Sequence, residues 1–274
     1  MYYYNLVSNE NIASINTYYG ITQNTDTQNF MIIMNYCESG DLTHYYINNE
    51  FLSIGWYKKL YLLYDIISGL MNIHRVDIIH KDFHGGNIFI KGKLGIMAVI
   101  GDLGISKSAI ESSNDDNEVY GIISYVAPEV LQGRRYTKAS DIYSFGMIMW
   151  ELMTGRKPFW DQNHNTNLII KICDGLRPPI DTNAPEDYIE IIRKCWDSDP
   201  DKRPTAFKLC ENIVEIRTKE SNNPTPIIIS SNIGPVMANN PRAIYKSRPL
   251  SAMIKSAVST RSLITSKLGN NLFI

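Results

Sequence analysis

Short apolar runs alternate with one long helical pattern in the first half of the chain. Residues 30–34 form a compact apolar run that predicts a buried strand, and residues 88–90 and 96–100 predict two more. Residues 1–29 are rich in Asn, Thr and Tyr, and we expect no more than a helix end and one strand there. From Ser53 onward, apolar residues recur every three or four positions, which predicts one face of a long helix. These positions are Leu60, Leu63, Tyr64, Ile67 and Met71.

The second half of the chain is a series of helical patterns. Residues 142–153 carry a single charge, Glu151, so this helix should be the most buried in the chain. Ser140 and Asp141 are placed to cap its start, and Gly155 is placed to end it. Further helices are predicted at residues 165–173, 185–196 and 205–216. The pattern as a whole predicts an α+β fold that is mainly helical.

The composition is typical of a globular domain and excludes several classes of function. The 274 residues carry a net charge of −1, which predicts no nucleic-acid or membrane affinity for the molecule as a whole. The four cysteines are scattered without a CxxC pair, as expected for free thiols rather than disulfides or a zinc site. We find neither a signal-peptide pattern nor an apolar run long enough for a transmembrane segment, and we expect a cytoplasmic or nuclear protein.

The composition changes after Glu220. Residues 221–274 are rich in Ser, Asn, Pro, Thr and Ile, and they contain six Lys and Arg residues but no acidic residue. This bias predicts a disordered basic tail over residues 219–274. The alternative is a segment that docks an anionic partner, such as a protein or a membrane surface.

Two polar turns carry the candidate chemistry. One has the sequence His-Lys-Asp-Phe-His-Gly-Gly-Asn over residues 80–87, and the other is Asp-Leu-Gly over residues 102–104. The two predicted strands between them would bring Asp82, Asn87 and Asp102 to one end of a hairpin. Carboxylate and amide oxygens there would suit Mg²⁺ and a transferable phosphate. Either turn alone is equally typical of an ordinary loop rich in Asp, Asn and Gly.

The order and spacing of these residues resemble the eukaryotic protein kinase family over residues 12–216. Residues 80–82 are similar to its catalytic-loop His-Arg-Asp, with Asn87 at the family's spacing, and residues 102–104 are similar to its metal-binding Asp-Phe-Gly. Further similar segments are Ala127-Pro128-Glu129, residues 141–146, Cys195-Trp196 and residues 199–204. The catalytic loop looks most like that of the tyrosine-kinase-like group, whose members mostly phosphorylate Ser and Thr.

The resemblance implies a protein serine/threonine kinase that uses ATP and Mg²⁺ and acts on a protein substrate. Asp82 would accept the proton of the substrate hydroxyl, with Asn87 as the second catalytic residue of the loop. Asn87 and Asp102 would hold Mg²⁺ against the phosphates. The polar stretch at residues 106–120 would be the activation loop, and long loops of this kind are usually functional.

The resemblance also implies where ATP would lie. Met34 would stand at the gatekeeper position beside the adenine. Asn35, Tyr36 and Cys37 would form the hinge whose backbone meets the adenine ring. Asp41 would reach the ribose, although its place before a predicted helix equally favours an N-cap.

Three further residues have structural roles in the family that the resemblance transfers to this chain. Glu129 and Arg203 would form a buried ion pair. Asp141 would accept hydrogen bonds from the backbone of the catalytic loop.

The chain departs from the family's pattern in its first 57 residues. The family has a Lys on its third strand and a glycine-rich loop over the phosphates, but the first Lys here is Lys58, and Gly20 is the only Gly before residue 30. We therefore expect residues 1–36 to be a remnant of a truncated N-terminal lobe and residues 37–218 to be a C-terminal lobe. Such a chain would be an impaired kinase, and the alternative is a non-catalytic scaffold similar to a pseudokinase.

Three smaller departures affect the handling of phosphate. Lys81 replaces an Arg that can bind a phosphate in bidentate fashion. His84 stands where Ser/Thr kinases usually carry a Lys, and Ile122 stands where many of them carry a Thr. We expect these three changes together to weaken phosphate binding.

Overall fold

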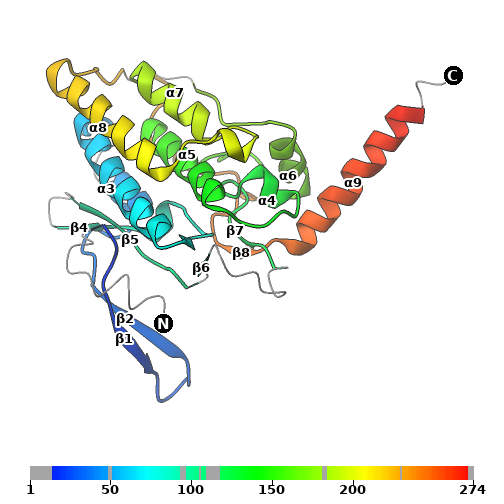
Figure 1. Cartoon of the computed structure of the whole chain (residues 1–274), viewed down its shortest axis with the longest axis horizontal. Coiled ribbons are helices and arrows are strands. Elements are labelled where there is room, and N and C mark those ends of the chain that lie inside the picture. Colours follow the sequence, from blue (N-terminus) through cyan, green and yellow to red (C-terminus); the bar gives the residue numbers. More distant parts are fainter. Residues whose placement is uncertain are drawn as a thin grey trace.

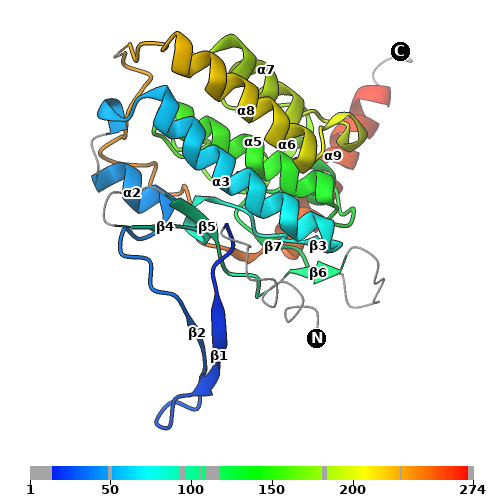
Figure 2. The same ribbon diagram turned by 60° about the vertical axis from the view of Figure 1, so that its left-hand side comes forward.

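The computed structural model describes residues 14–48, 51–92, 97–104, 106–108, 118–180, 184–228 and 230–270. Over these residues a helical body carries four two-stranded antiparallel sheets, which confirms the mainly helical α+β fold (Figures 1 and 2). The helices are α2 (Leu42–Asn48), α3 (Trp56–Arg75), α4 (Pro128–Leu131), α5 (Lys138–Thr154), α6 (Thr166–Cys173), α7 (Glu186–Cys195), α8 (Ala206–Asn222) and α9 (Ser251–Asn270). The strand pairs are β1 (Tyr18–Gln23) with β2 (Phe30–Met34), β3 (Ile78–Ile79) with β6 (Lys107–Ser108), β4 (Ile88–Lys91) with β5 (Met97–Ile100), and β7 (Tyr120–Gly121) with β8 (Arg248–Pro249).

Helix α5 lies in the middle of the body and packs against α3 and α7 (Figure 1). Its residues 140–154 are all buried, which confirms the burial predicted from the pattern. The predicted cap was wrong, because the helix starts at Lys138 and its N-cap is Thr137. Thr137 and Ser140 form a capping box in which each side chain bonds the other's backbone N–H. Asp141 is thereby free of capping and turns toward the catalytic loop.

Helix α3 has the predicted amphipathic face, which packs against α8 and β5. Lys59 is the exception on this face, since its side chain is buried although the residue is cationic. Its Nζ lies 3.8 Å from the centroid of the Phe51 ring and 5.1 Å from that of Trp56. Burial lowers the pKa of Lys59 to about 7, because a charged ammonium loses its hydration there.

Hairpin β1–β2 confirms the strand predicted at residues 30–34 but not its burial. All five residues of β2 are exposed, from 36% for Met34 to 76% for Phe30. Both views show the hairpin projecting away from the helical body (Figures 1 and 2). The apolar side chains stay exposed because a two-stranded ribbon that leaves the body has no helix or sheet against which to bury a face.

Hairpin β4–β5 forms where two buried strands were predicted. Ile88 pairs with Ile100 and Ile90 pairs with Ala98, and all four side chains are fully buried. Helix α3 packs on β5, and α2 packs on β4. The polar turns before β4 and after β5 therefore meet at one end of a fixed hairpin.

The structure differs from the disorder predicted for residues 219–274 over the part of that range it describes. Helix α8 continues to Asn222, and residues 230–270, which we call the C-terminal segment, run back over the body and end in α9. Leu250, Ile254 and Ala257 are buried at helical spacing, and α9 packs on α6 (Figure 1). This apolar face supplies the burial that the basic composition did not suggest. No helix in the described part of the chain is long and apolar enough to cross a membrane.

Candidate active site

The catalytic loop that precedes β4 is held to the body by one carboxylate. Asp141 accepts hydrogen bonds from the backbone N–H of His80 at 2.8 Å and of Lys81 at 3.0 Å. His74 Nε2 lies 2.9 Å from the same side chain, which is 1% exposed. This confirms the predicted role of Asp141. It also fixes a backbone that is otherwise unfavourable, since Lys81 has a φ of +70°.

Asp82 lies in a buried position within this loop, close to His84. Its Oδ1 is 3.5 Å from His84 Nε2, and the residue is only 8% exposed. Burial raises the pKa of Asp82, but hydrogen bonds from His84 and Ser247 outweigh it and leave the pKa below its usual value. The side chain is thus a carboxylate at neutral pH and can accept a proton.

Asn87 closes the catalytic loop and lies opposite the second polar turn. Its Nδ2 donates to the backbone oxygen of Asp82 at 2.8 Å, which directs the side chain back into the loop. Its own backbone oxygen accepts from the Gly101 N–H at 2.9 Å, one step beyond the β4–β5 ladder. Asp102 follows Gly101 directly, so Asp82, Asn87 and Asp102 all lie at the same end of the β4–β5 hairpin.

A second bond ties the same turn to the catalytic loop. His80 Nε2–H donates to the Gly101 backbone oxygen at 3.1 Å, and the ring is buried against Phe83. Burial lowers the pKa of His80, so the ring is neutral and keeps this donor in place. Gly101 has no room for a side chain, since an added Cβ would lie 2.5 Å from the Phe89 ring. Asp102 itself is exposed with a φ of +52°, as a residue facing a ligand can be.

The side chains at this end of the hairpin carry oxygen donors of the kind that bind Mg²⁺. Asn87 and Asp102 offer an amide and a carboxylate oxygen, the hard ligands that Mg²⁺ takes. The described residues contain no group of three His, Cys, Asp or Glu side chains that could hold a metal alone. Mg²⁺ commonly binds through one or two protein groups plus phosphates and water, and this donor set is of that kind.

The residues predicted to meet adenine lie at the base of the exposed hairpin. Met34 is 36% exposed and Tyr36 is 87% exposed, whereas Cys37 is buried, which raises the pKa of its thiol. The Asn35 backbone oxygen accepts a hydrogen bond from Asn16 Nδ2 at 3.3 Å. No packing contact in the described structure bears on their predicted role in adenine binding, because most of this surface contacts solvent.

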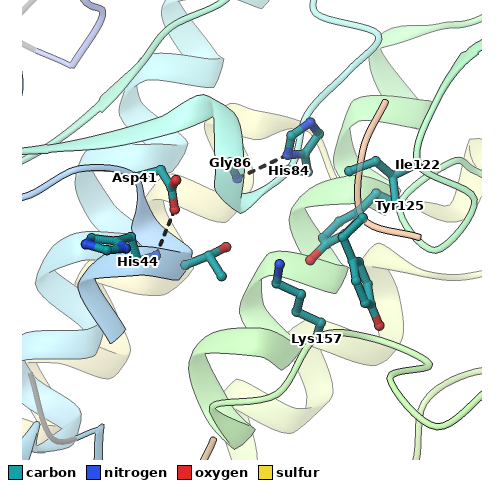
Figure 3. Close-up of a pocket in the computed structure, with 9 residues that line it drawn as sticks. Asp41, His44, His84, Gly86, Ile122, Tyr125 and Lys157 are labelled. Atoms are coloured by element: carbon teal, nitrogen blue, oxygen red, sulfur yellow. Dashed lines mark hydrogen bonds between the residues drawn. The ribbon is translucent and has the colours of Figure 1, made fainter. Parts of the chain in front are cut away.

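Asp41 caps helix α2 and also borders a cavity in front of the catalytic loop. Its Oδ1 accepts the His44 N–H at 2.8 Å, as an N-cap does. The cavity has a volume of about 250 Å³ and is lined by His84, Gly86 and Lys157 as well (Figure 3). Figure 3 shows Asp41 and His84 on opposite sides of this space.

The predicted ion pair between Glu129 and Arg203 is confirmed. Two hydrogen bonds of 2.7 Å join the guanidinium to the carboxylate, and the two side chains are 5% exposed or less. Arg203 also donates to the Ala139 backbone oxygen at 2.9 Å. The pair joins the end of the activation segment to the turn before α8.

Sequence reasoning missed two contacts at this site. His84 was noted only as a replacement for a Lys, but it hydrogen-bonds within the loop and approaches Asp82. Ser247 comes from the segment expected to be disordered, and its Oγ lies 3.2 Å from His84 Nε2. No periodic pattern in the sequence marks Ser247, because it lies just before β8, a strand of only two residues.

The fold and this cluster of oxygen ligands beside a buried carboxylate define a protein kinase domain. The chain matches the family described as protein tyrosine and serine/threonine kinase over residues 3–213. It belongs to that family.

Curated relatives share the domain and are much longer than this chain. Probable serine/threonine-protein kinase roco6 of Dictyostelium discoideum is 32% identical, over 80% of this chain and 11% of that protein. Putative serine/threonine-protein kinase/receptor R831 of Acanthamoeba polyphaga mimivirus is 30% identical, over 69% of this chain and 11% of that protein. Stress-activated protein kinase alpha of D. discoideum is 31% identical, over 70% of this chain and 32% of that protein. The chain thus spans from about a tenth to a third of the length of these relatives.

Proposed function

We propose that this domain transfers the γ-phosphate of ATP to Ser and Thr hydroxyls of a protein substrate. The observation that carries the proposal is a pair of hydrogen bonds at Gly101, whose N–H donates to the Asn87 backbone oxygen and whose own backbone oxygen accepts from His80 Nε2–H. These bonds hold Asp102 beside the loop that bears Asp82. The names of two of these relatives, both serine/threonine-protein kinases, support the hydroxyl specificity.

Asp82 acts as the residue that receives the substrate proton. Its lowered pKa keeps it ionised at neutral pH, and its burial keeps its position fixed. A carboxylate of this kind orients the hydroxyl for in-line attack and accepts its proton as the new bond to phosphorus forms. Asn87 contributes by bonding the Asp82 backbone oxygen and so holding the loop closed.

Asn87 and Asp102 hold Mg²⁺, which when bound neutralises charge on the phosphates. The adenine lies against the backbone of Asn35, Tyr36 and Cys37, with Met34 beside it. Asp41 reaches the ribose and keeps its capping bond to His44 through Oδ1.

The same features predict a slow enzyme. No Lys or Arg occurs in residues 1–57, so no cation from that part of the chain contacts the phosphates. Electrostatic stabilisation is strongest where water is excluded, and the exposed hairpin at the adenine side leaves water in contact with the site. These two observations also favour the second candidate, a non-catalytic scaffold that uses the kinase fold for binding.

Transfer of phosphate to a generic basic protein, measured with Mg-ATP, tests the proposal. We expect slow turnover that requires Mg²⁺ and that Asp82→Asn lowers about 10²- to 10⁴-fold, the usual contribution of a general base. Asp187→Asn is the matched control, since that surface carboxylate pairs with Lys219 far from the loop. Turnover that survives Asp82→Asn would overturn the proposal.

Nucleotide binding separates the two candidates independently of turnover. A ligand that binds the native state raises the melting temperature in a saturable manner. We expect such a rise with Mg-ATP, and a smaller one for Asp102→Asn. A melting temperature that does not respond to millimolar Mg-ATP would favour the scaffold.

A further inference from the structure

The C-terminal segment crosses the active site as an added strand. Strand β8 pairs with β7 of the activation segment, with Arg248 opposite Gly121 and Pro249 opposite Tyr120. The pairing continues where the Leu250 N–H donates to the Val119 backbone oxygen at 2.7 Å, and Leu250 itself is fully buried. A short strand added to a sheet edge is one of the common ways in which proteins bind extended peptides.

Side-chain contacts fix the segment on both sides of the strand. Tyr245 borders the cavity in front of the catalytic loop, and its hydroxyl donates to the Pro158 backbone oxygen at 2.8 Å. Arg248 donates through Nη2 to the backbone oxygen of His164 at 2.9 Å. The His164 ring contacts the Ile244 backbone oxygen at 3.0 Å and packs edge-on against Tyr245. The segment is therefore bound as a peptide of defined register.

This register places the Ser247 hydroxyl at the catalytic loop. His84 Nδ1 accepts the Gly86 N–H at 3.0 Å, so a neutral His84 carries its proton on Nε2. That Nε2–H donates to Ser247 Oγ at 3.2 Å, which leaves the hydroxyl proton of Ser247 directed elsewhere. Asp82 Oδ1 lies 3.5 Å from the same His84 Nε2, so the Asp82 carboxylate is the acceptor beside the Ser247 hydroxyl.

We infer that Ser247 is a phosphoacceptor of this chain's own active site, and that residues 245–250 occupy the peptide-substrate position. The inference rests on the proposed kinase function and adds the identity of one substrate. Lys246 and Arg248 flank the acceptor, so a Ser between two basic residues is the substrate chemistry that the bound segment displays.

The chemical step balances with ATP as the phosphate donor. Ser247 Oγ forms a bond to the γ-phosphorus, the bond from that phosphorus to the β,γ-bridging oxygen breaks, and ADP leaves with the electron pair. The Ser247 hydroxyl proton passes to the Asp82 carboxylate. The product carries about two negative charges beside Asp82, and the like charges repel, so we expect phosphorylation to release the segment from the loop.

The test uses the full 274-residue chain, treated first with phosphatase and then with Mg-ATP. Mass spectrometry with fragment ions should locate phosphate on Ser247, distinct from Tyr245 and Ser251. The initial rate per molecule should stay constant when the protein concentration changes 50-fold, because the acceptor is in the same chain. An Asp102→Asn chain added as a second acceptor should receive less than a tenth of the phosphate.

Matched variants show whether the hydroxyl position matters. Ser247→Ala should reduce phosphate on the C-terminal segment at least tenfold, and Ser247→Thr should retain it. Ser259→Ala is the control, since that exposed hydroxyl bonds only the Lys255 backbone oxygen of its own helix among its described contacts. Melting temperatures of the three variants confirm that each is folded.

A generic basic protein in the same assay distinguishes the possible failures. Phosphate on that protein but none on Ser247 would overturn this inference and leave the kinase function intact. A rate per molecule that rises with protein concentration would equally overturn it, since transfer would then occur between chains. Phosphate on neither acceptor would overturn the kinase function, and this inference with it.

Discussion

Hairpins β1–β2 and β4–β5 are built from similarly apolar strands but lie in opposite environments. Ile90 of β4 is fully buried, whereas Ile33 of β2 is 48% exposed. The difference comes from the neighbours, because α2 and α3 pack on β4–β5 while β1–β2 projects from the body. The residues proposed for proton transfer and metal binding thus belong to a fixed hairpin, and those proposed for adenine belong to an exposed one.

Removing the carboxylate that holds the catalytic loop should lower stability strongly. Asp141→Ala leaves the buried N–H group of His80 and the partly buried N–H group of Lys81 without their acceptor. We expect the free energy of unfolding in urea to fall by about 4 kcal/mol, since each unsatisfied buried donor costs ~1–3 kcal/mol. Asp77→Asn is the control, because its half-exposed pair with Lys138 should contribute under about 1 kcal/mol. Equal losses for both variants would show that the loop is not held in this way.

Truncating one isoleucine in each hairpin tests the comparison directly. Ile90→Ala removes fully buried methyl groups and should lower the free energy of unfolding by about 2–5 kcal/mol. Ile33→Ala, at a 48% exposed position of β2, should change it by no more than about 0.5 kcal/mol. A loss at Ile33 as large as that at Ile90 would mean that the β1–β2 hairpin is covered in solution.

Lys59 is the opposite case to β2: it is a cationic residue that is buried, whereas the β2 residues are apolar but exposed. Lys59→Met should raise the free energy of unfolding by about 2 kcal/mol at neutral pH, because a buried charge is replaced by an apolar side chain of similar length. Lys58→Met, at the adjacent exposed position, is the control and should have little effect.

The pH dependence of that gain follows from the pKa of Lys59. The pKa is about 7 in the folded chain and 10.5 when the side chain is unperturbed, so the unfolded chain binds the extra proton between these values. The destabilisation by Lys59 is complete below pH 7 and is relieved as the pH rises toward 10.5. The difference in melting temperature between the two proteins should therefore shrink over this range. A constant difference would show that Lys59 stays charged when folded.

Local sequence patterns predicted the parts of the molecule in which side-chain spacing determines the structure. The interval between Asn87 and Asp102 holds two apolar runs and a turn, so the hairpin that joins them could be predicted. The single charge between residues 142 and 153 likewise predicted the most buried helix. The predicted start of this helix was wrong because both Thr137 and Ser140 are residue types that cap helices, and only the backbone geometry shows that Thr137 is the N-cap and Ser140 its capping-box partner.

Contacts between distant segments could not be predicted in the same way. The burial of β2 depends on which elements pack against it, and the sequence of β2 itself does not show whether any element does. The approach of Ser247 to His84 depends on backbone hydrogen bonds between β7 and β8, which any sequence without Pro at the donor positions can make. The prediction of disorder around Ser247 rested on composition, which does not register the helical spacing of the apolar residues Leu250, Ile254 and Ala257.

The pairing of β7 with β8 also sets an order of events during synthesis of the protein. In sequence, 132 residues separate Val119 from Ser251, whose Oγ accepts the Val119 N–H at 2.9 Å. At ribosomal rates of ~5–20 residues per second, a strand partner that far downstream emerges on the order of ten seconds later. The catalytic loop, its hairpin and α5 can assemble in that interval, before the C-terminal segment covers the catalytic loop. The nascent chain therefore passes through a stage in which its active site is accessible before its own C-terminal strand arrives to cover it.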